Sequence, residues 1–179
     1  MARVKIALTC SQCGKGFEHI HSCRNSADAA SYEEWARANI NICPACYAAQ
    51  KAADEREKYN AYIASFGKHC LPEIIGVSEK QIAFASSLRE KFISDELMRY
   101  KINIPAYFRV AERIDFGALT DEQRTSAETK AAQAGQTPEV WFRTFALCRG
   151  LRLPYEGIVR KIDVTFTEFS ASKIIDALR

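Results

Sequence analysis

Apolar and polar residues alternate over residues 3–9 of the chain. Val4, Ile6 and Leu8 share one set of alternate positions, which is the pattern of a strand with one buried face. Residues 16–20 are expected to form a second short strand. The pattern therefore predicts β-structure in this part of the chain.

A second alternating stretch covers residues 162–167, where Ile162, Val164 and Phe166 share one face and β-branched residues dominate. We expect a strand here, with the strand at residues 3–9 as its most economical partner. Ser170 is placed to cap a short final helix.

Residues 26–41 and 47–66 have helical patterns. The second of these ranges holds no Gly or Pro and is rich in Ala, Glu and Lys, and Gly67 follows it as a helix C-cap. Residues 68–76 then interrupt the helical pattern with a proline and a glycine, which is typical of a boundary.

Helix signals recur after this interruption. Ser78 and Gln81 have the spacing of a capping box, and Phe84, Leu88 and Phe92 recur every four residues, so this stripe is expected to face a core.

Three more helical stretches follow. Residues 95–116 predict two short helices separated at Pro105. Thr120 begins a second capping box, which opens a polar helix or connector that stops near Gly135. Pro138 begins a further helix, which Arg149 and Gly150 close.

The elements together predict an α+β fold that is mostly α-helical, with a small antiparallel sheet. We expect two domains, a cysteine-bearing module over residues 1–69 and a helical domain with a C-terminal strand and short helix over residues 70–179. With 179 residues, 47% hydrophobic and 26% charged, the chain is long and apolar enough to fold around a core. It contains no apolar run of membrane-spanning length.

Two C-x-x-C pairs provide the strongest chemical signal, namely Cys10 with Cys13 and Cys43 with Cys46. Four thiolates from two such pairs can close a tetrahedral zinc site. Because protein ligands then fill every position, the expected zinc is structural rather than catalytic. The alternative interpretation is four ordinary buried cysteines.

Other potential metal ligands lie outside these pairs, so the ligand set stays open at this point. They are His19, His21, Cys23, His69 and Cys70. Seven cysteines without a recognisable secretion signal favour a reducing cytoplasm over a disulfide framework.

The order of a cysteine pair, a strand and a helix that starts at the second pair resembles the treble-clef class of zinc fingers. The resemblance covers residues 1–69 and implies a structural zinc module, although the 29 residues between the pairs exceed the insert of compact members. Residues 71–89 are similar to a segment of uncharacterised bacterial phage and plasmid proteins. That similarity implies a bacterial or mobile-element source and carries no known activity.

A basic stretch begins at Arg143 and contains one acidic residue, Glu156. Its cations are Arg143, Arg149, Arg152, Arg160 and Lys161. Phe145 and Tyr155 lie among them, and arginines beside aromatic rings can hold phosphates and stack on bases. We therefore expect a nucleic-acid surface, although dispersed solvated charges around core aromatics would give the same pattern.

The competing hypothesis is a protein-binding adaptor or inhibitor with an apolar patch near Trp141 or Tyr107. The net charge of +3 permits nucleic-acid binding without requiring it. An enzyme is not expected, because the sequence contains none of the nucleotide-binding, metalloprotease or hydrolase motifs that indicate one.

Overall fold

The computed structural model describes residues 2–179. Its internal contacts divide the chain into two compact units, Met1–Lys58 and Tyr59–Arg179, with the boundary inside helix α2 (Pro44–Ala64). The sequence pattern favours a later boundary, at residues 68–76. The difference arises because the last turn of α2 contributes side chains to the core of the second unit.

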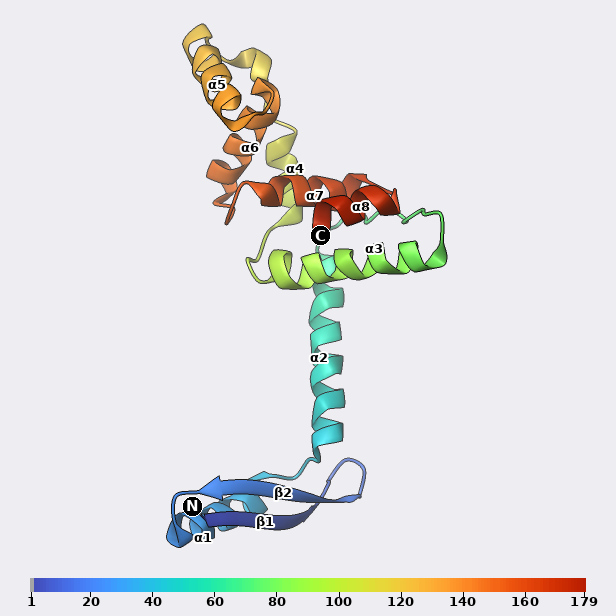
Figure 1. Cartoon of the computed structure of the whole chain (residues 1–179), viewed down its shortest axis with the longest axis vertical. Helices are drawn as coiled ribbons and strands as arrows, with labels where there is room; N and C mark the ends of the chain where they lie inside the picture. Colours follow the sequence, from blue (N-terminus) through green and yellow to red (C-terminus); the bar gives the residue numbers. More distant parts are fainter. Residues whose placement is uncertain (1) are drawn as a thin grey trace. The chain divides into compact units, whose positions relative to one another are not determined.

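The first unit is built on a hairpin of two antiparallel strands, β1 (Ala2–Thr9) and β2 (Gly16–Cys23). Helix α1 (Ser26–Asn39) lies alongside this hairpin (Figure 1). Ile6 on β1 is fully buried, as the alternating pattern predicts. The two expected strands and the helix at residues 26–41 are thus confirmed.

The partner of β1 differs from the prediction. β1 pairs with β2 in a register that places Ile6 opposite His19, and the two strands form the whole sheet within residues 2–179. The expected pairing with residues 162–167 is wrong. Strands joined by a short turn pair at low loop-closure cost, whereas the predicted pairing would close a loop across most of the chain.

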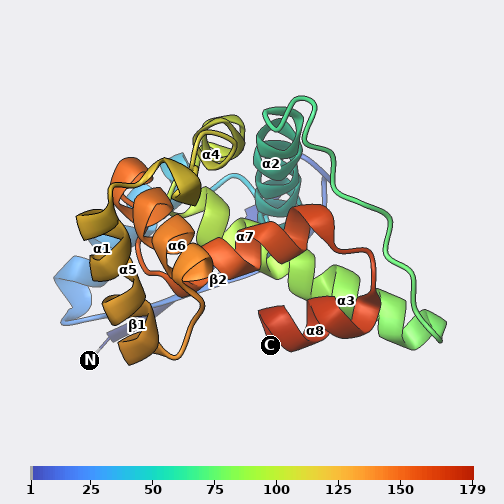
Figure 2. The same cartoon turned by 90° about the horizontal axis from the view of Figure 1, so that it is seen from above.

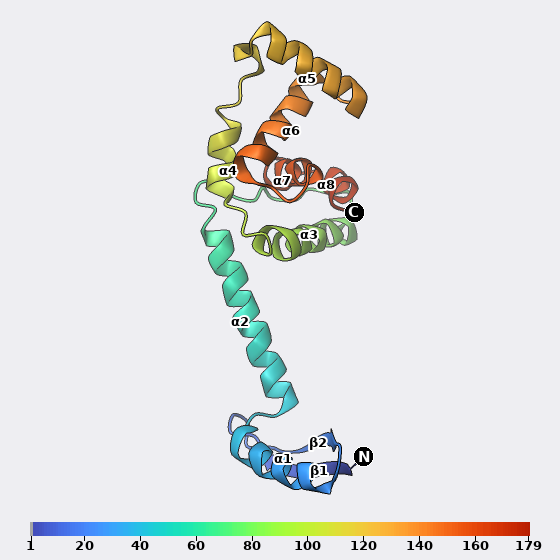
Figure 3. The ribbon, with the colours of Figure 1, turned by 90° about the vertical axis from the view of Figure 1, so that its left-hand side faces the viewer.

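The second unit is helical. Its regular elements after α2 are α3 (Glu79–Phe92), a π-helical turn η1 (Ile93–Met98), α4 (Ile104–Ala111), a 3₁₀ turn η2 (Phe116–Ala118), α5 (Asp121–Ala134), α6 (Pro138–Leu151), α7 (Gly157–Thr167) and α8 (Ala171–Leu178). Helix α7 lies between α6 and α8 (Figure 2). Helix α5 packs on α6, at the end of this unit away from α3 (Figure 3). The mostly helical fold with a small antiparallel sheet agrees with the prediction.

The strand predicted at residues 162–167 is wrong, because these residues belong to helix α7. Ile158, Ile162 and Phe166 recur every four residues and are all buried in the core of the second unit. Over so short a stretch, the apolar residues fit both the two-residue period of a strand and the four-residue spacing of a helix face. The longer apolar series that begins at Ile158 fits only the helix. Tertiary packing thus overrides the strand preference of the β-branched residues.

The stripe on α3 is a core stripe only at one end. Phe92 is buried with 4% of its surface exposed, whereas Phe84 is 48% exposed. The buried side chains of α3 are Ala85, Arg89 and Phe92. The prediction that Phe84 faces a core is therefore wrong, because the buried face is rotated toward Ala85 and Arg89.

Some helix caps follow the sequence closely, but Gly150 lies inside α6, whose C-cap is Arg152, and Ser170 precedes α8 without a side-chain capping hydrogen bond. Thr120 and Gln123 form a reciprocal capping box at α5, and Gly135 closes that helix with a left-handed φ of 65°. Ser78 caps α3 by accepting a hydrogen bond from the Gln81 amide. The Gln81 side chain accepts a hydrogen bond from the amide of Val77 instead of that of Ser78. The capping box at α3 is therefore not reciprocal. Within residues 2–179, no helix combines the length and apolar character needed to cross a membrane.

Candidate metal centre and basic surface

The two cysteine pairs lie at turns that the local sequence shapes. Cys10 directly follows β1, and the chain turns back at Gly14, whose φ is 69° and whose amide donates to the Cys10 carbonyl at 2.9 Å. Cys43 directly precedes α2 and Cys46 lies in its first turn. A backbone hydrogen bond joins the two cysteine turns, because the amide of Ser11 donates to the carbonyl of Asn41 at 2.7 Å.

The fold brings the four cysteine sulfurs together. The Sγ atoms of Cys10, Cys13, Cys43 and Cys46 all lie within 4.8 Å of one another. The Sγ atoms of Cys13 and Cys43 are 3.9 Å apart. A tetrahedral ion with metal–sulfur bonds of about 2.3 Å requires sulfurs about 3.8 Å apart. The group can therefore hold a metal ion, and four sulfur ligands in tetrahedral order suit zinc or iron.

Backbone amides point at two of these sulfurs. The amide of Cys43 donates to Cys10 Sγ at 3.3 Å, and the amide of Cys46 donates to Cys43 Sγ at 3.4 Å. The Cys43 amide, followed by that of Cys13, lowers the pKa of Cys10 to about 6. These donors stabilise negative charge on sulfur, which is the form that binds metal.

Cys46 has the opposite preference in the absence of a cation. Hydrogen bonds with Cys43 and then Cys13 raise its pKa to about 12. Packing several thiolates together disfavours full ionisation unless a positive charge joins them. A divalent ion bound to the four sulfurs would supply that charge and would displace the remaining protons.

The other potential ligands lie outside this group. His19 shares a 2.8 Å hydrogen bond with the Tyr32 hydroxyl, and His21 stacks on the same ring with centroids 3.9 Å apart. His69 stacks on Phe108 at 4.3 Å. Among residues 2–179, no second cluster of cysteine, histidine or acidic ligands is suited to a metal, so Cys23 and Cys70 also lie outside the site.

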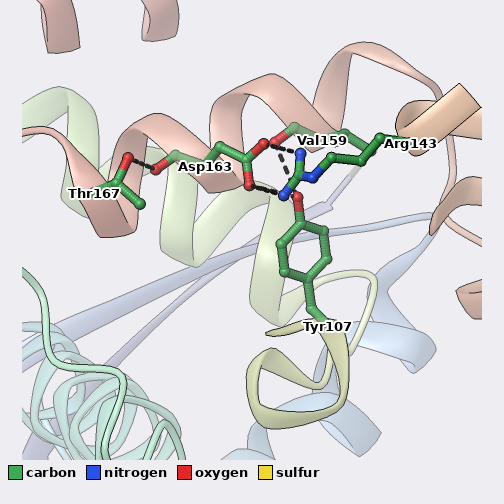
Figure 4. Close-up of polar contacts among 5 residues, drawn as sticks. All are labelled: Tyr107, Arg143, Val159, Asp163 and Thr167. Carbon is green, nitrogen blue, oxygen red and sulfur yellow. Dashed lines mark hydrogen bonds and ion pairs between the residues drawn. The ribbon is translucent and has the colours of Figure 1, made fainter. Parts of the chain in front are cut away.

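Arg143, the first of the predicted surface cations, is already paired. Its guanidinium donates to both carboxylate oxygens of Asp163, and the contact from Nη2 to Oδ1 measures 3.0 Å (Figure 4). The hydroxyl of Tyr107 also donates to Asp163, at 2.8 Å, from a side chain that is fully buried. Tyr107 therefore cannot contribute to an exposed apolar patch.

Lys161 is paired in the same way. Its ammonium donates to Glu96 at 2.8 Å and lies 5.7 Å from the centroid of the Phe92 ring. The hydroxyl of Tyr155 donates to the same Glu96 carboxylate. Lys161 and Tyr155 thus tie α7 and the preceding loop to η1.

The remaining three predicted cations make no ion pair with any described carboxylate. Arg149 lies over the Phe145 ring, with its guanidinium carbon 6.0 Å from the centroid. Arg152 ends α6 in the left-handed conformation with a φ of 52°. Arg160 lines a cavity between α6 and α7, together with Arg143 and Asp163. Arg143 and Arg160 thus line one cavity, whereas Lys161 is held against η1 by Glu96.

The structure adds one cation that the sequence did not reveal. Trp141 and Phe145 stack with centroids 5.1 Å apart and an interplanar angle of 12°. Lys130 on α5 places its ammonium 5.7 Å from the centroid of the Trp141 indole. The four-residue spacing of Trp141, Phe145 and Arg149 is visible in the sequence, but the approach of Lys130 depends on how α5 packs against α6.

No family model, curated protein or solved structure matches this chain.

Proposed function

We propose that this chain is a non-enzymatic binding protein, braced by a structural zinc ion, that contacts single-stranded nucleic acid through α6. The observation that carries this proposal is a row of four side chains, which we call the α6 row. It consists of Lys130, Trp141, Phe145 and Arg149. Two stacked rings with a cation at each end match what an unpaired strand offers, namely bases and phosphates.

Arg149 and Arg152 provide the electrostatic part of the proposed surface. Both are exposed and neither has an acidic partner among residues 2–179. Unpaired guanidinium groups can bind phosphates, by donating hydrogen bonds to them, without first breaking an internal ion pair. Arg143 and Lys161 would have to give up Asp163 and Glu96, so we assign them a structural role.

The proposed zinc ion is structural because four cysteine ligands leave no open position for water. Such an ion would tie the β1–β2 turn to the start of α2, two segments whose own apolar content is small. The order of turn, second strand and ligand-bearing helix supports a treble-clef-like module. Metal binding then contributes folding free energy that the first unit cannot obtain from its few buried side chains.

The primary experiment measures binding of a fluorescently labelled single-stranded oligonucleotide by anisotropy at about 50 and about 200 mM salt. We expect binding at the lower concentration and a steep loss at the higher one, because binding to phosphates releases counterions. No binding at about 50 mM salt would contradict the proposal.

Charge reversal tests the residues. The pair Arg149→Glu with Arg152→Glu should weaken binding at least tenfold and flatten the salt dependence. The matched control is Lys80→Glu with Lys91→Glu, which changes the net charge equally on exposed positions of α3. Equal losses in both pairs would show that only net charge matters and would remove Arg149 and Arg152 from the site.

A protein-binding role is the alternative, and a separate observation favours it. Several large apolar side chains near the start of α3 and before α8 are exposed, namely Ile75, Val77, Phe84 and Phe169. The amide of Ile75 donates to the Phe169 carbonyl at 2.6 Å, so these two residues are neighbours. Exposed apolar groups of this kind are typical of protein interfaces. Failure of the single-stranded oligonucleotide to bind at about 50 mM salt would favour this role.

The source and compartment are part of the same proposal. The similarity of residues 71–89 supports a bacterial phage or mobile element. The seven cysteines, four of which form the two C-x-x-C pairs, support a reducing compartment such as the cytoplasm.

A further inference from the structure

We propose that the cavity between α5 and α6 receives a single unstacked base of the bound strand, with a preference for guanine. This inference rests on the proposed function and names its recognition pocket. The cavity has a volume of about 430 Å³. Trp141, Phe142 and Phe145 line it from α6, and Glu122, Gln123 and Ser126 line it from α5.

The α6 wall is suited to a planar ligand. The nearly parallel rings of Trp141 and Phe145 belong to the α6 row, so a strand held by Arg149 passes the mouth of the cavity. Lys130 is exposed and its ammonium lies 5.7 Å from the indole centroid, close to the outer limit of about 6 Å for a cation–π contact. This side chain can move aside for a base and pair with a phosphate instead.

The α5 wall supplies hydrogen-bonding groups that are not fully used. Gln123 accepts from the Thr120 amide through Oε1 at 3.1 Å, which leaves its Nε2 donors available. Within residues 2–179, no hydrogen bond engages the carboxylate of Glu122 or the hydroxyl of Ser126. The wall therefore offers donors and acceptors to the edge of a base.

The carboxylate of Glu122 should decide whether a base or the phosphate backbone of the strand enters the cavity. A carboxylate repels phosphate, so the base rather than the backbone should occupy the cavity. An ionised carboxylate only accepts hydrogen bonds, and guanine presents two adjacent N–H donors on its pairing edge, whereas adenine presents one donor beside an acceptor. Glu122 should therefore favour guanine.

The test uses the full chain carrying Trp35→Phe, which leaves Trp141 as the single tryptophan. The probes are short deoxyribose-phosphate strands that carry one guanine, one adenine or no base. We expect guanine to quench Trp141 fluorescence and to bind about tenfold more tightly than the strand without a base, with adenine between them.

The outcomes separate this inference from the proposed function. If all three strands bind with equal affinity and leave Trp141 fluorescence unchanged, the base pocket is wrong while salt-dependent binding stands. If neither these strands nor an ordinary oligonucleotide binds, both proposals fail.

Two variants of α5 test the cavity itself. Ser126→Leu should fill it and abolish the advantage of guanine, while affinity for the strand without a base stays the same. Thr129→Leu is the matched control, because Thr129 is exposed on the same helix and does not line the cavity. Circular dichroism checks that both variants fold. A guanine advantage that survives in Ser126→Leu would overturn the inference.

Discussion

Arg143 on α6 and Asp163 on α7 form a bidentate ion pair, in which both terminal nitrogens of the guanidinium contact the carboxylate (Figure 4). The side chains of Arg143 and Asp163 are 36% and 29% exposed. The pair joins two helices that both contribute to the core. It also removes Arg143 from the set of cations available to a ligand.

Partial burial should make this ion pair stronger than a surface pair. In a double-mutant cycle with Arg143→Ala and Asp163→Ala, we expect a coupling free energy of about 1 kcal/mol. The matched cycle on Lys5 and Glu18, whose side chains are 59% and 55% exposed, should give about 0.3 kcal/mol. Urea unfolding measures both, and equal values would contradict the structural role of the Arg143 pair.

Tyr107 contributes its hydroxyl to the same carboxylate. Tyr107→Phe leaves the ring in the core but removes the hydroxyl that donates to Asp163 at 2.8 Å and approaches the Val159 carbonyl at 3.3 Å, so the free energy of unfolding should fall by about 1 kcal/mol. Burial, followed by the charge of Asp163, also raises the pKa of Tyr107 above its usual value. The hydroxyl therefore stays protonated as a donor.

Tyr100→Phe is the control for Tyr107→Phe, because Tyr100 is 46% exposed. It should change stability by less than about 0.5 kcal/mol. Chemical unfolding of the two variants decides the point. A loss in Tyr100→Phe as large as that in Tyr107→Phe would show that the contacts of the buried Tyr107 hydroxyl are not the cause.

Two glycines should respond in opposite directions to alanine. A Cβ at Gly76 would lie 2.9 Å from Ile82 Cγ1 and 3.0 Å from Ala171 Cβ, so Gly76→Ala should cost about 1–3 kcal/mol. Gly150 lies inside α6, and its nearest neighbour to an added Cβ is 3.9 Å away. Gly150→Ala should stabilise the chain by about 0.5–1 kcal/mol. Thermal unfolding of both variants checks the difference in sign.

Glu168 makes stability depend on pH. The amide of Ser170 and then Lys173 lower its pKa below the usual 4.5. A lowered carboxyl pKa stabilises the folded state above pH 4.5, and that stabilisation is lost as the pH falls through the lowered value.

Glu168→Gln should therefore destabilise the chain at pH 7 and progressively less below pH 4.5. Urea midpoints of wild type and variant across pH 3–7 measure this convergence. Glu90→Gln, at an exposed position of α3, is the control and should show no such trend. A gap between Glu168→Gln and wild type that stays constant with pH would contradict the assignment.

Metal content tests the cysteine group. Protein purified without chelator should contain about one zinc ion per chain, and Cys13→Ser should lose most of it together with the hairpin structure of the first unit. Cys70→Ser is the control, because Cys70 is exposed and outside the group. Elemental analysis with circular dichroism measures both properties. A folded first unit without metal would contradict a structural ion.

Local chemistry made part of this structure predictable from the sequence. The spacing of Cys10 and Cys13, the capping box at Thr120 and the alternation around Ile6 each depend on residues only a few positions apart. Such signals survive in any fold, because a cap or a two-cysteine turn satisfies its own backbone groups. The grouping of the four cysteines, the strands of the hairpin and most helix starts were therefore predicted.

Contacts between distant residues decided the rest. The sequence by itself determined that the four cysteines could meet and that α6 would carry rings and arginines at a spacing of four. Only the tertiary structure decided that residues 162–167 form a helix, that Arg143 faces Asp163 and that Lys130 reaches Trp141. The physical reason is that burial and ion pairing depend on which helices pack together, and a short apolar pattern is compatible with more than one packing.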